Sequence, residues 1–132
     1  MHAADIYDYA VIRVVPRVER EEFVNVGVIL SCQTGNFLRA AIALDEARLH
    51  ALDAGIDLAT VRRHLNAIVA ICDGTPDSGP IGRLPLRARF HWLTARRSGI
   101  IQTSPVHTGR CQHGDAALQG VMRRMVLPPG AA

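Results

Sequence analysis

The sequence predicts an α+β fold, with an antiparallel sheet of about five strands and two to three helices packed on one face. Three observations predict it. The first 42 residues alternate apolar and polar positions in strand-length runs, the middle of the chain has apolar residues at helical spacing, and further strand-length runs precede a last helical segment. Because the chain has 132 residues, 48% of them hydrophobic, we expect residues 1–132 to form a single domain with its own core.

The N-terminal 42 residues predict three consecutive antiparallel strands. The first covers residues 7–15, the second covers 23–32, and the third ends near Ile42. A turn of almost only charged residues, 17–22, joins the first two strands, and residues 33–36 have the composition of a hairpin turn.

The register of the second hairpin follows from its apolar residues. Every second residue of the segment 24–32 from Val24 onward is apolar, so we expect this face of the strand to be core. Matching the apolar faces places Val28 opposite Ile42 and Leu30 opposite Ala40. That register requires a five-residue loop or a bulge.

Three aspartates, Asp45, Asp57 and Asp115, precede helical patterns and are predicted to cap them. The pattern after Asp57 is a single apolar stripe at spacings of three and four, which is typical of a helix lying on a sheet. It consists of Leu58, Val61, Leu65, Ile68 and Cys72.

The rest of the chain is less regular. Residues 73–85 are rich in Gly, Pro, Asp and Ser and predict a flexible loop, either a linker or a cover over a site. Strands are expected at 89–93 and 100–103, followed by a turn-rich segment at 104–109. Residues 127–132 are expected to form a disordered tail.

Composition excludes several kinds of chemistry. All fifteen basic residues are Arg, so Schiff-base catalysis, a P-loop lysine and a lysine general base are excluded. The three cysteines are widely spaced, which indicates reduced thiols and neither a disulfide framework nor a zinc ribbon. The N-terminus lacks the pattern of a secretory signal, and the longest apolar runs fall short of the roughly 20 residues that span a bilayer. We expect a cytoplasmic protein with no membrane association.

Ser104 and His107 are the candidates for a nucleophile and its base, because they lie three residues apart in a loop after a strand. The alternative is structural: Ser104 begins a turn and His107 bonds a backbone carbonyl. No Gly-x-Ser-x-Gly elbow is present, and Pro105 removes the amide that would donate to an oxyanion. The sequence therefore favours a protein that is not an enzyme.

A metal site is considered at His107, Cys111 and His113, but this spacing matches no closed zinc pattern. We therefore expect neither a metal nor a cofactor.

Arginines supply the candidate binding residues. Arg96 and Arg97 follow the only tryptophan, Trp92, and their guanidinium groups suit a phosphate or a carboxylate. The alternative is a basic turn with Trp92 in the core.

The predicted strands add a polar face. Arg13, Asn25, Gly27 and Arg39 interrupt otherwise apolar strands and form the leading predicted binding surface. The alternative for Arg13 is a salt bridge to Glu19 or Glu22 across the hairpin.

Four segments together resemble a known family. They are Tyr7–Arg17, Glu22–Leu30, Arg89–Leu93 and Ser104–Gly109. This combination is similar to the small bacterial proteins of the domain-of-unknown-function family number 3037. The resemblance covers nearly the whole chain and implies no reaction, cofactor or catalytic residue. It implies a genomic neighbourhood of kinase-like proteins similar to the HipA toxin kinase. Arg97 stands where the family pattern has proline, so we expect that turn to differ in shape.

Two functions follow as expectations. The first is a non-catalytic interaction or accessory module that binds a protein partner, such as a HipA-like kinase, through a sheet edge or an exposed face. The second is a small enzyme or binding protein for a phosphate- or carboxylate-bearing metabolite, with Arg13, Arg96 and Arg97 on the anion and His107 as base. Nucleic-acid binding is disfavoured because the arginines are scattered among acidic residues at a net charge of only +3. A homodimer is compatible with the sequence.

Overall fold

A computed structural model describes residues 5–130 and confirms the α+β fold, with one antiparallel sheet of five strands. The strands are β1 (Asp5–Val14), β2 (Val24–Cys32), β3 (Phe37–Ile42), β4 (Ile101–Thr103) and β5 (His107–Cys111). Four α-helices lie within the described residues, one or two more than the sequence predicted. They are α1 (Glu46–Leu52), α2 (Leu58–Asp73), α3 (Leu86–Leu93) and α4 (Gly114–Met125).

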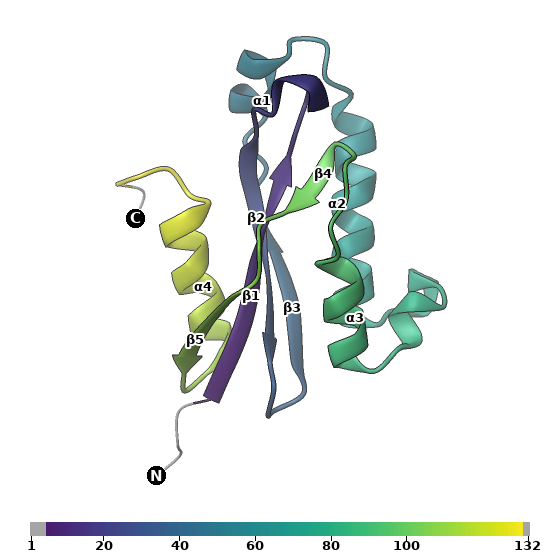
Figure 1. Cartoon of the computed structure of the whole chain (residues 1–132), viewed down its shortest axis with the longest axis vertical. Helices are drawn as coiled ribbons and strands as arrows, with labels where there is room; N and C mark the ends of the chain where they lie inside the picture. Colours follow the sequence, from purple (N-terminus) through teal and green to yellow (C-terminus); the bar gives the residue numbers. More distant parts are fainter. Residues whose placement is uncertain (1–4, 131–132) are drawn as a thin grey trace.

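Strand β1 lies in the middle of the sheet and pairs with three others (Figure 1). The order is β3-β2-β1-β4, and β5 pairs with β1 as well. On the side away from β2, β1 is flanked by β5 along residues 5–9 and by β4 along residues 12–14. The pairing along this side of β1 is therefore interrupted between β4 and β5, where Ser104 lies.

The β2–β3 hairpin has a different register from the predicted one. Cys32 pairs with Phe37 and Leu30 with Arg39, so the pairing is shifted by one residue and the loop has four residues. Gly35 and Asn36 both adopt positive φ, 118° and 51°, which lets this short turn close without an insertion. The predicted register was wrong because Ala40 and Ile42 pack with Ile29 on one face of the sheet, whereas Val28 and Leu30 belong to the cluster on the other face.

A β-bulge in the pairing with β1 interrupts the predicted apolar face of β2. Ile12 pairs with Gly27 but Arg13 pairs with Asn25, so Val26 is the extra residue. Val24 and Val26 consequently belong to one hydrophobic cluster, and Val28, Leu30 and Cys32 belong to another. The expectation of one continuous core face on β2 was wrong.

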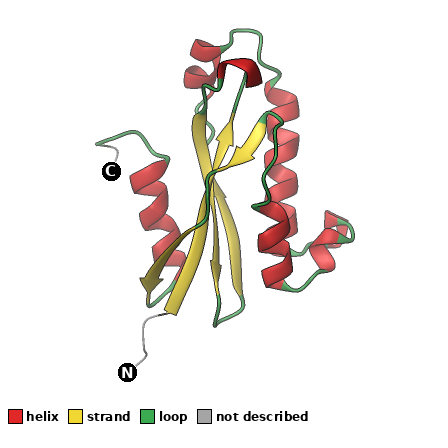
Figure 2. Ribbon diagram, in the orientation of Figure 1, coloured by secondary structure: helices red, strands yellow, loops and turns green. Residues whose placement is uncertain are grey.

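The two clusters lie on opposite faces of the sheet, and helices cover both (Figure 2). Helices α2 and α3 supply Val61, Leu65, Phe90 and Leu93 to one cluster. Helix α4 supplies Leu118, Val121 and Met122 to the other. The sequence placed all helices on one face, and this was wrong for α4: beyond the bulge, Val28, Leu30 and Cys32 belong to the opposite face, and α4 covers it.

The starts of α1 and α2 follow the prediction. The side chains of Asp45 and Asp57 accept hydrogen bonds from the backbone N–H groups of Arg48 and Thr60, each at 3.1 Å. Helix α4 begins earlier than predicted, with His113 at its N-cap and Asp115 in its first turn.

Two segments change their assignment. Residues 89–93 were predicted as a strand but lie in α3, because Leu86, Phe90 and Leu93 recur at helical spacing and Pro85 provides a helix start. The predicted turn at 104–109 runs into β5, which begins at His107.

The predicted loop at 73–85 contains two short 3-10 helices, Pro76–Ser78 and Ile81–Arg83. Arg89 fastens this segment to α2, because its guanidinium donates to the carbonyls of Leu84, Ile71 and Cys72 at 2.9–3.0 Å. Flexibility of this segment stays a prediction. Of the predicted tail, residues 131 and 132 lie outside the described residues.

Candidate functional site

A groove of about 680 Å³, which we call the arginine groove, opens between the end of β1, the approach to β2 and the turn before β4. Three of the four arginines predicted to bind a ligand line it, together with an aromatic ring, Phe23, that was not predicted. Its lining consists of Arg13, Val15, Val18, Glu21, Phe23, Arg96, Arg97, Ser98 and Gln102. Glu21 is the single carboxylate among these residues.

Arg13 is held by an aromatic ring instead of a carboxylate. Its guanidinium carbon lies 4.2 Å from the centre of the Phe23 ring, and its Nε is buried with no hydrogen-bond partner among the described residues. A buried donor without a partner is unusual and calls for an explanation.

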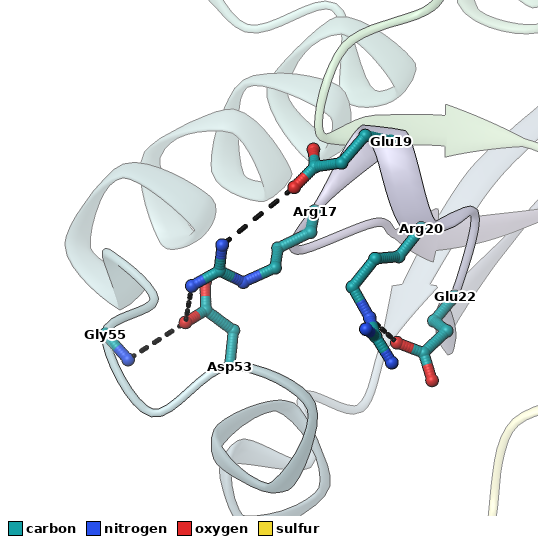
Figure 3. Close-up of polar contacts among 6 residues, drawn as sticks. All are labelled: Arg17, Glu19, Arg20, Glu22, Asp53 and Gly55. Atoms are coloured by element: carbon teal, nitrogen blue, oxygen red, sulfur yellow. Dashed lines mark hydrogen bonds and ion pairs between the residues drawn. The ribbon is translucent and has the colours of Figure 1, made fainter.

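The alternative salt bridge from Arg13 to Glu19 or Glu22 is wrong. Glu22 accepts a hydrogen bond from Arg20 at 2.6 Å, and Glu19 lies 3.9 Å from Arg17 (Figure 3). The charged turn pairs with itself and, through Arg17, with Asp53 at 3.5 Å. Arg13 therefore has no carboxylate partner among the described residues.

Arg97 has a structural role in addition to its place in the groove. It donates to the backbone carbonyls of Trp92 and Leu93 at 2.6 and 2.9 Å and so caps the C-terminus of α3. Its guanidinium carbon also lies 4.6 Å from the centre of the Trp92 ring, which is exposed and not in the core. Arg96 is exposed and makes no ion pair within residues 5–130.

The other residues of the predicted polar face are separated. Asn25 donates to the carbonyl of Met125 at 2.9 Å and so joins β2 to the end of α4. Gly27 lies on the opposite face, where a Cβ would come within 2.6 Å of the Ala41 carbonyl oxygen. Arg39 pairs with Asp115 at 3.7 Å, in the first turn of α4 and away from the groove.

Ser104 and His107 are not paired with each other. The buried Ser104 hydroxyl accepts a hydrogen bond from the Val11 N–H at 2.9 Å and donates to the Pro105 carbonyl at 2.9 Å. His107 is exposed on β5, and its ring packs against Tyr9 with 5.3 Å between centres. The arrangement matches the structural alternative for Ser104.

A buried charge cluster was missed by the sequence analysis. Asp8, on β1, accepts hydrogen bonds from Arg87 of α3 at 2.5 Å and from Thr108 of β5 at 2.8 Å. Burial alone would raise the pKa of Asp8, but these hydrogen bonds and the charge of Arg87 outweigh it and lower the pKa below its usual value. Asp8 and Arg87 are 79 positions apart, so only their polar character within apolar segments could have pointed to them.

A second, apolar cavity adjoins the groove. This cavity, the tryptophan pocket, measures about 330 Å³ and is enclosed by α2, the end of α3 and β4. Its lining includes Ile68, Ile71, Trp92, Leu93, Ile101 and Thr103. Arg97 and Gln102 line both the tryptophan pocket and the arginine groove.

Metal-ligating side chains do not gather in the part of the chain that the structure describes: no group of three His, Cys, Asp or Glu residues is placed to hold an ion. Among residues 5–130, no helix combines the length and hydrophobicity needed to cross a membrane.

Comparison with known proteins identifies a family and nothing beyond it. Searches of curated proteins and of solved structures found no match. The model of the family described as "Protein of unknown function (DUF3037)" matches residues 9–126, which include all the elements described above except the start of β1. The chain therefore belongs to the DUF3037 family.

Proposed function

We propose that this chain is a binding module that recognises an anionic group, a carboxylate or a phosphate, carried by a protein partner, at the arginine groove. The observation that supports it is the buried, unpartnered Nε of Arg13 beside two further guanidinium groups. An arginine fork binds carboxylate or phosphate oxygens in a bidentate manner, which would satisfy that donor.

The groove is pre-organised for such a ligand. Arg97 is fixed by its bonds to α3, and Arg13 is fixed by its contact with Phe23. Binding then orders few side chains, so less conformational entropy is lost than at a site of free arginines. Arg96 is exposed and can move to complete the contact.

A HipA-like kinase is the first partner to test, because the family resemblance implies such a neighbour. The first experiment is therefore affinity purification of the full chain at native expression level, followed by titration of the purified partner. We expect one stoichiometric partner whose affinity decreases as the salt concentration rises.

Matched charge variants test the groove. Arg13→Gln with Arg96→Gln removes two charges from the groove and should weaken binding by about tenfold or more, since charge-assisted hydrogen bonds are each worth roughly 1.5–3 kcal/mol. Arg48→Gln with Arg110→Gln removes two charges from exposed positions elsewhere and should leave the affinity unchanged. Equal affinity for both double variants would refute the groove as the binding site.

A small anionic metabolite is the second candidate, because the volume of the groove falls within the range of small-molecule sites, about 300–1,000 Å³. Calorimetric titration of the purified chain with inorganic phosphate and with citrate tests it directly. Binding that Arg13→Gln abolishes, together with failure to recover a protein partner, would favour this candidate over the first.

A further inference from the structure

We infer that the free edge of β4 accepts an extended segment of the partner, in which apolar and acidic residues alternate, and adds it to the sheet as a new strand. This inference rests on the proposed function and specifies the chemistry of the partner. It depends on three features: the orientation of the β4 backbone, the two adjoining cavities, and the charge of one of them.

The outer edge of β4 has unused backbone groups. β4 is the terminal strand of the sheet and pairs only with β1 among the described residues. The Val15 N–H donates to the Ile100 carbonyl, and the Ser104 N–H donates to the Val11 carbonyl. Hydrogen-bonded and non-bonded pairs alternate along an antiparallel ladder, so the backbone groups of Ile101 and Thr103 point away from β1. They form a template for one more strand.

The two cavities lie on opposite faces of this edge. Ile101 and Thr103 pair with Val14 and Ile12, whose side chains belong to the cluster beneath α2 and α3, and they line the tryptophan pocket. Gln102 pairs with Arg13, which lines the arginine groove on the other face. Gln102 reaches both cavities because it stands at the edge itself.

An added strand would send its side chains alternately to the two faces. One set enters the tryptophan pocket between Ile68 and Trp92, and the next set reaches Arg13, Arg96 and Arg97 in the arginine groove. The apolar pocket selects an aliphatic or aromatic side chain, and the guanidinium groups select a carboxylate. The ligand is therefore a short extended segment with an apolar–acidic repeat.

A second copy of this chain fits the same edge less well. Two β4 edges joined antiparallel about a twofold axis would bring two arginine groups to the same face of the joint sheet, where like charges repel. An acidic segment has the opposite charge and avoids this repulsion.

The experiment uses a synthetic peptide of about six residues that alternates leucine and glutamate, a length typical of one strand. Trp92 is the only tryptophan in the chain and lines the pocket, so its fluorescence reports occupancy. We expect saturable binding that weakens by about tenfold or more when lysine replaces glutamate. Unchanged binding of the lysine peptide would overturn the inference.

Two ways of blocking the backbone hydrogen bonds at the edge of β4 test this inference separately from the proposed function. Thr103→Pro removes an outward N–H without removing a bond to β1, and it should weaken peptide binding about tenfold. N-methylation of the peptide on alternate residues tests the same contact without changing the protein: one of the two patterns should abolish binding and the other should not.

The outcomes are distinct. If Arg13→Gln weakens binding of the natural partner but neither Thr103→Pro nor either methylation pattern weakens peptide binding, strand addition is refuted and the proposed function stands. If Arg13→Gln with Arg96→Gln leaves partner binding intact, the proposed function fails. A dimer in sedimentation analysis that Thr103→Pro dissociates would also overturn the inference, because the edge would then belong to a second copy.

Discussion

Replacement of Ser104 by alanine tests whether this residue serves structure or chemistry. The Ser104 hydroxyl occupies the break between β4 and β5, where it accepts the Val11 N–H and donates to the Pro105 carbonyl. Val11 is buried in the middle of the sheet, so water cannot replace the hydroxyl without entering the core. Ser104→Ala therefore leaves a buried N–H without a partner.

The magnitude follows from that lost bond. An unsatisfied buried backbone donor costs about 1–3 kcal/mol, and we take about 2 kcal/mol because the methyl group of alanine keeps most of the local packing. For a domain of this size the loss lowers Tm by roughly 6–12 °C. Ser98→Ala, at an exposed residue whose side chain makes no hydrogen bond within residues 5–130, is the matched control and should change Tm by roughly 1–2 °C at most.

Thermal unfolding followed by circular dichroism measures both variants, and urea unfolding gives the free energies. A wild-type stability for Ser104→Ala would refute the structural role. In that case a functional role with His107 would have to be reconsidered, and His107→Ala would be the next variant to measure.

Three further predictions follow from the structure. Asp8→Asn should destabilise the fold by roughly 1–2 kcal/mol at pH 7. This is less than the loss of a fully buried ion pair would cost, because the Arg87 side chain is 41% exposed and solvent screens its charge. Because the folded-state pKa of Asp8 is lowered, its carboxylate stabilises the fold above the unfolded-state pKa, and the difference from Asn should shrink as pH falls below about 4. Gly27→Ala should cost roughly 1–3 kcal/mol in urea unfolding, since its Cβ would meet backbone. Iodoacetamide at pH 8 should modify Cys111 first, because burial raises the pKa of Cys72 to about 12 and that of Cys32 to about 11.

Each of these predictions has a control. A constant difference between Asp8→Asn and wild type down to pH 3 would contradict the role of the carboxylate charge. Gly55→Ala places its Cβ at an ordinary 3.7 Å from its nearest neighbour and should be close to neutral. Modification of Cys72 in the folded chain as fast as in urea would contradict its burial.

Helix caps and strand ends could be predicted from the sequence because their causes are local. Asp45 and Asp57 accept bonds from residues three positions ahead, and this spacing is visible in the chain. Trp92 was harder. It shares strand-like alternation with Phe90, yet the helical spacing of Phe90 with Leu86 and Leu93 decided the structure, and this leaves Trp92 on the exposed side.

The candidate site could be predicted only in part. Arg13, Arg96 and Arg97 were all proposed as binding residues and the structure brings them to one groove, although nothing in the sequence set the distance between them. Gly27 was grouped with Arg13 on the assumption of regular alternation in β2. One extra residue in a strand has no compositional signature, so the bulge that moves Gly27 to the other face could not be predicted. Arg39 is separated for another reason: it lies opposite Leu30, farther along the sheet, and pairs with Asp115.

The bulge at Val26 also explains why the groove forms where it does. With regular alternation, Phe23 and Asn25 would lie on the face beneath α2, and Val24 and Val26 would lie beside Arg13. The extra residue exchanges the two sets: the valines enter the core beneath α2, and Phe23 comes under the Arg13 guanidinium. A bulge gives up a regular ladder bond, and proteins retain bulges where they re-aim side chains at sites. Here the bulge places the Phe23 ring against Arg13, whose buried Nε has no hydrogen-bond partner among the described residues. The proposed anion would complete this arrangement.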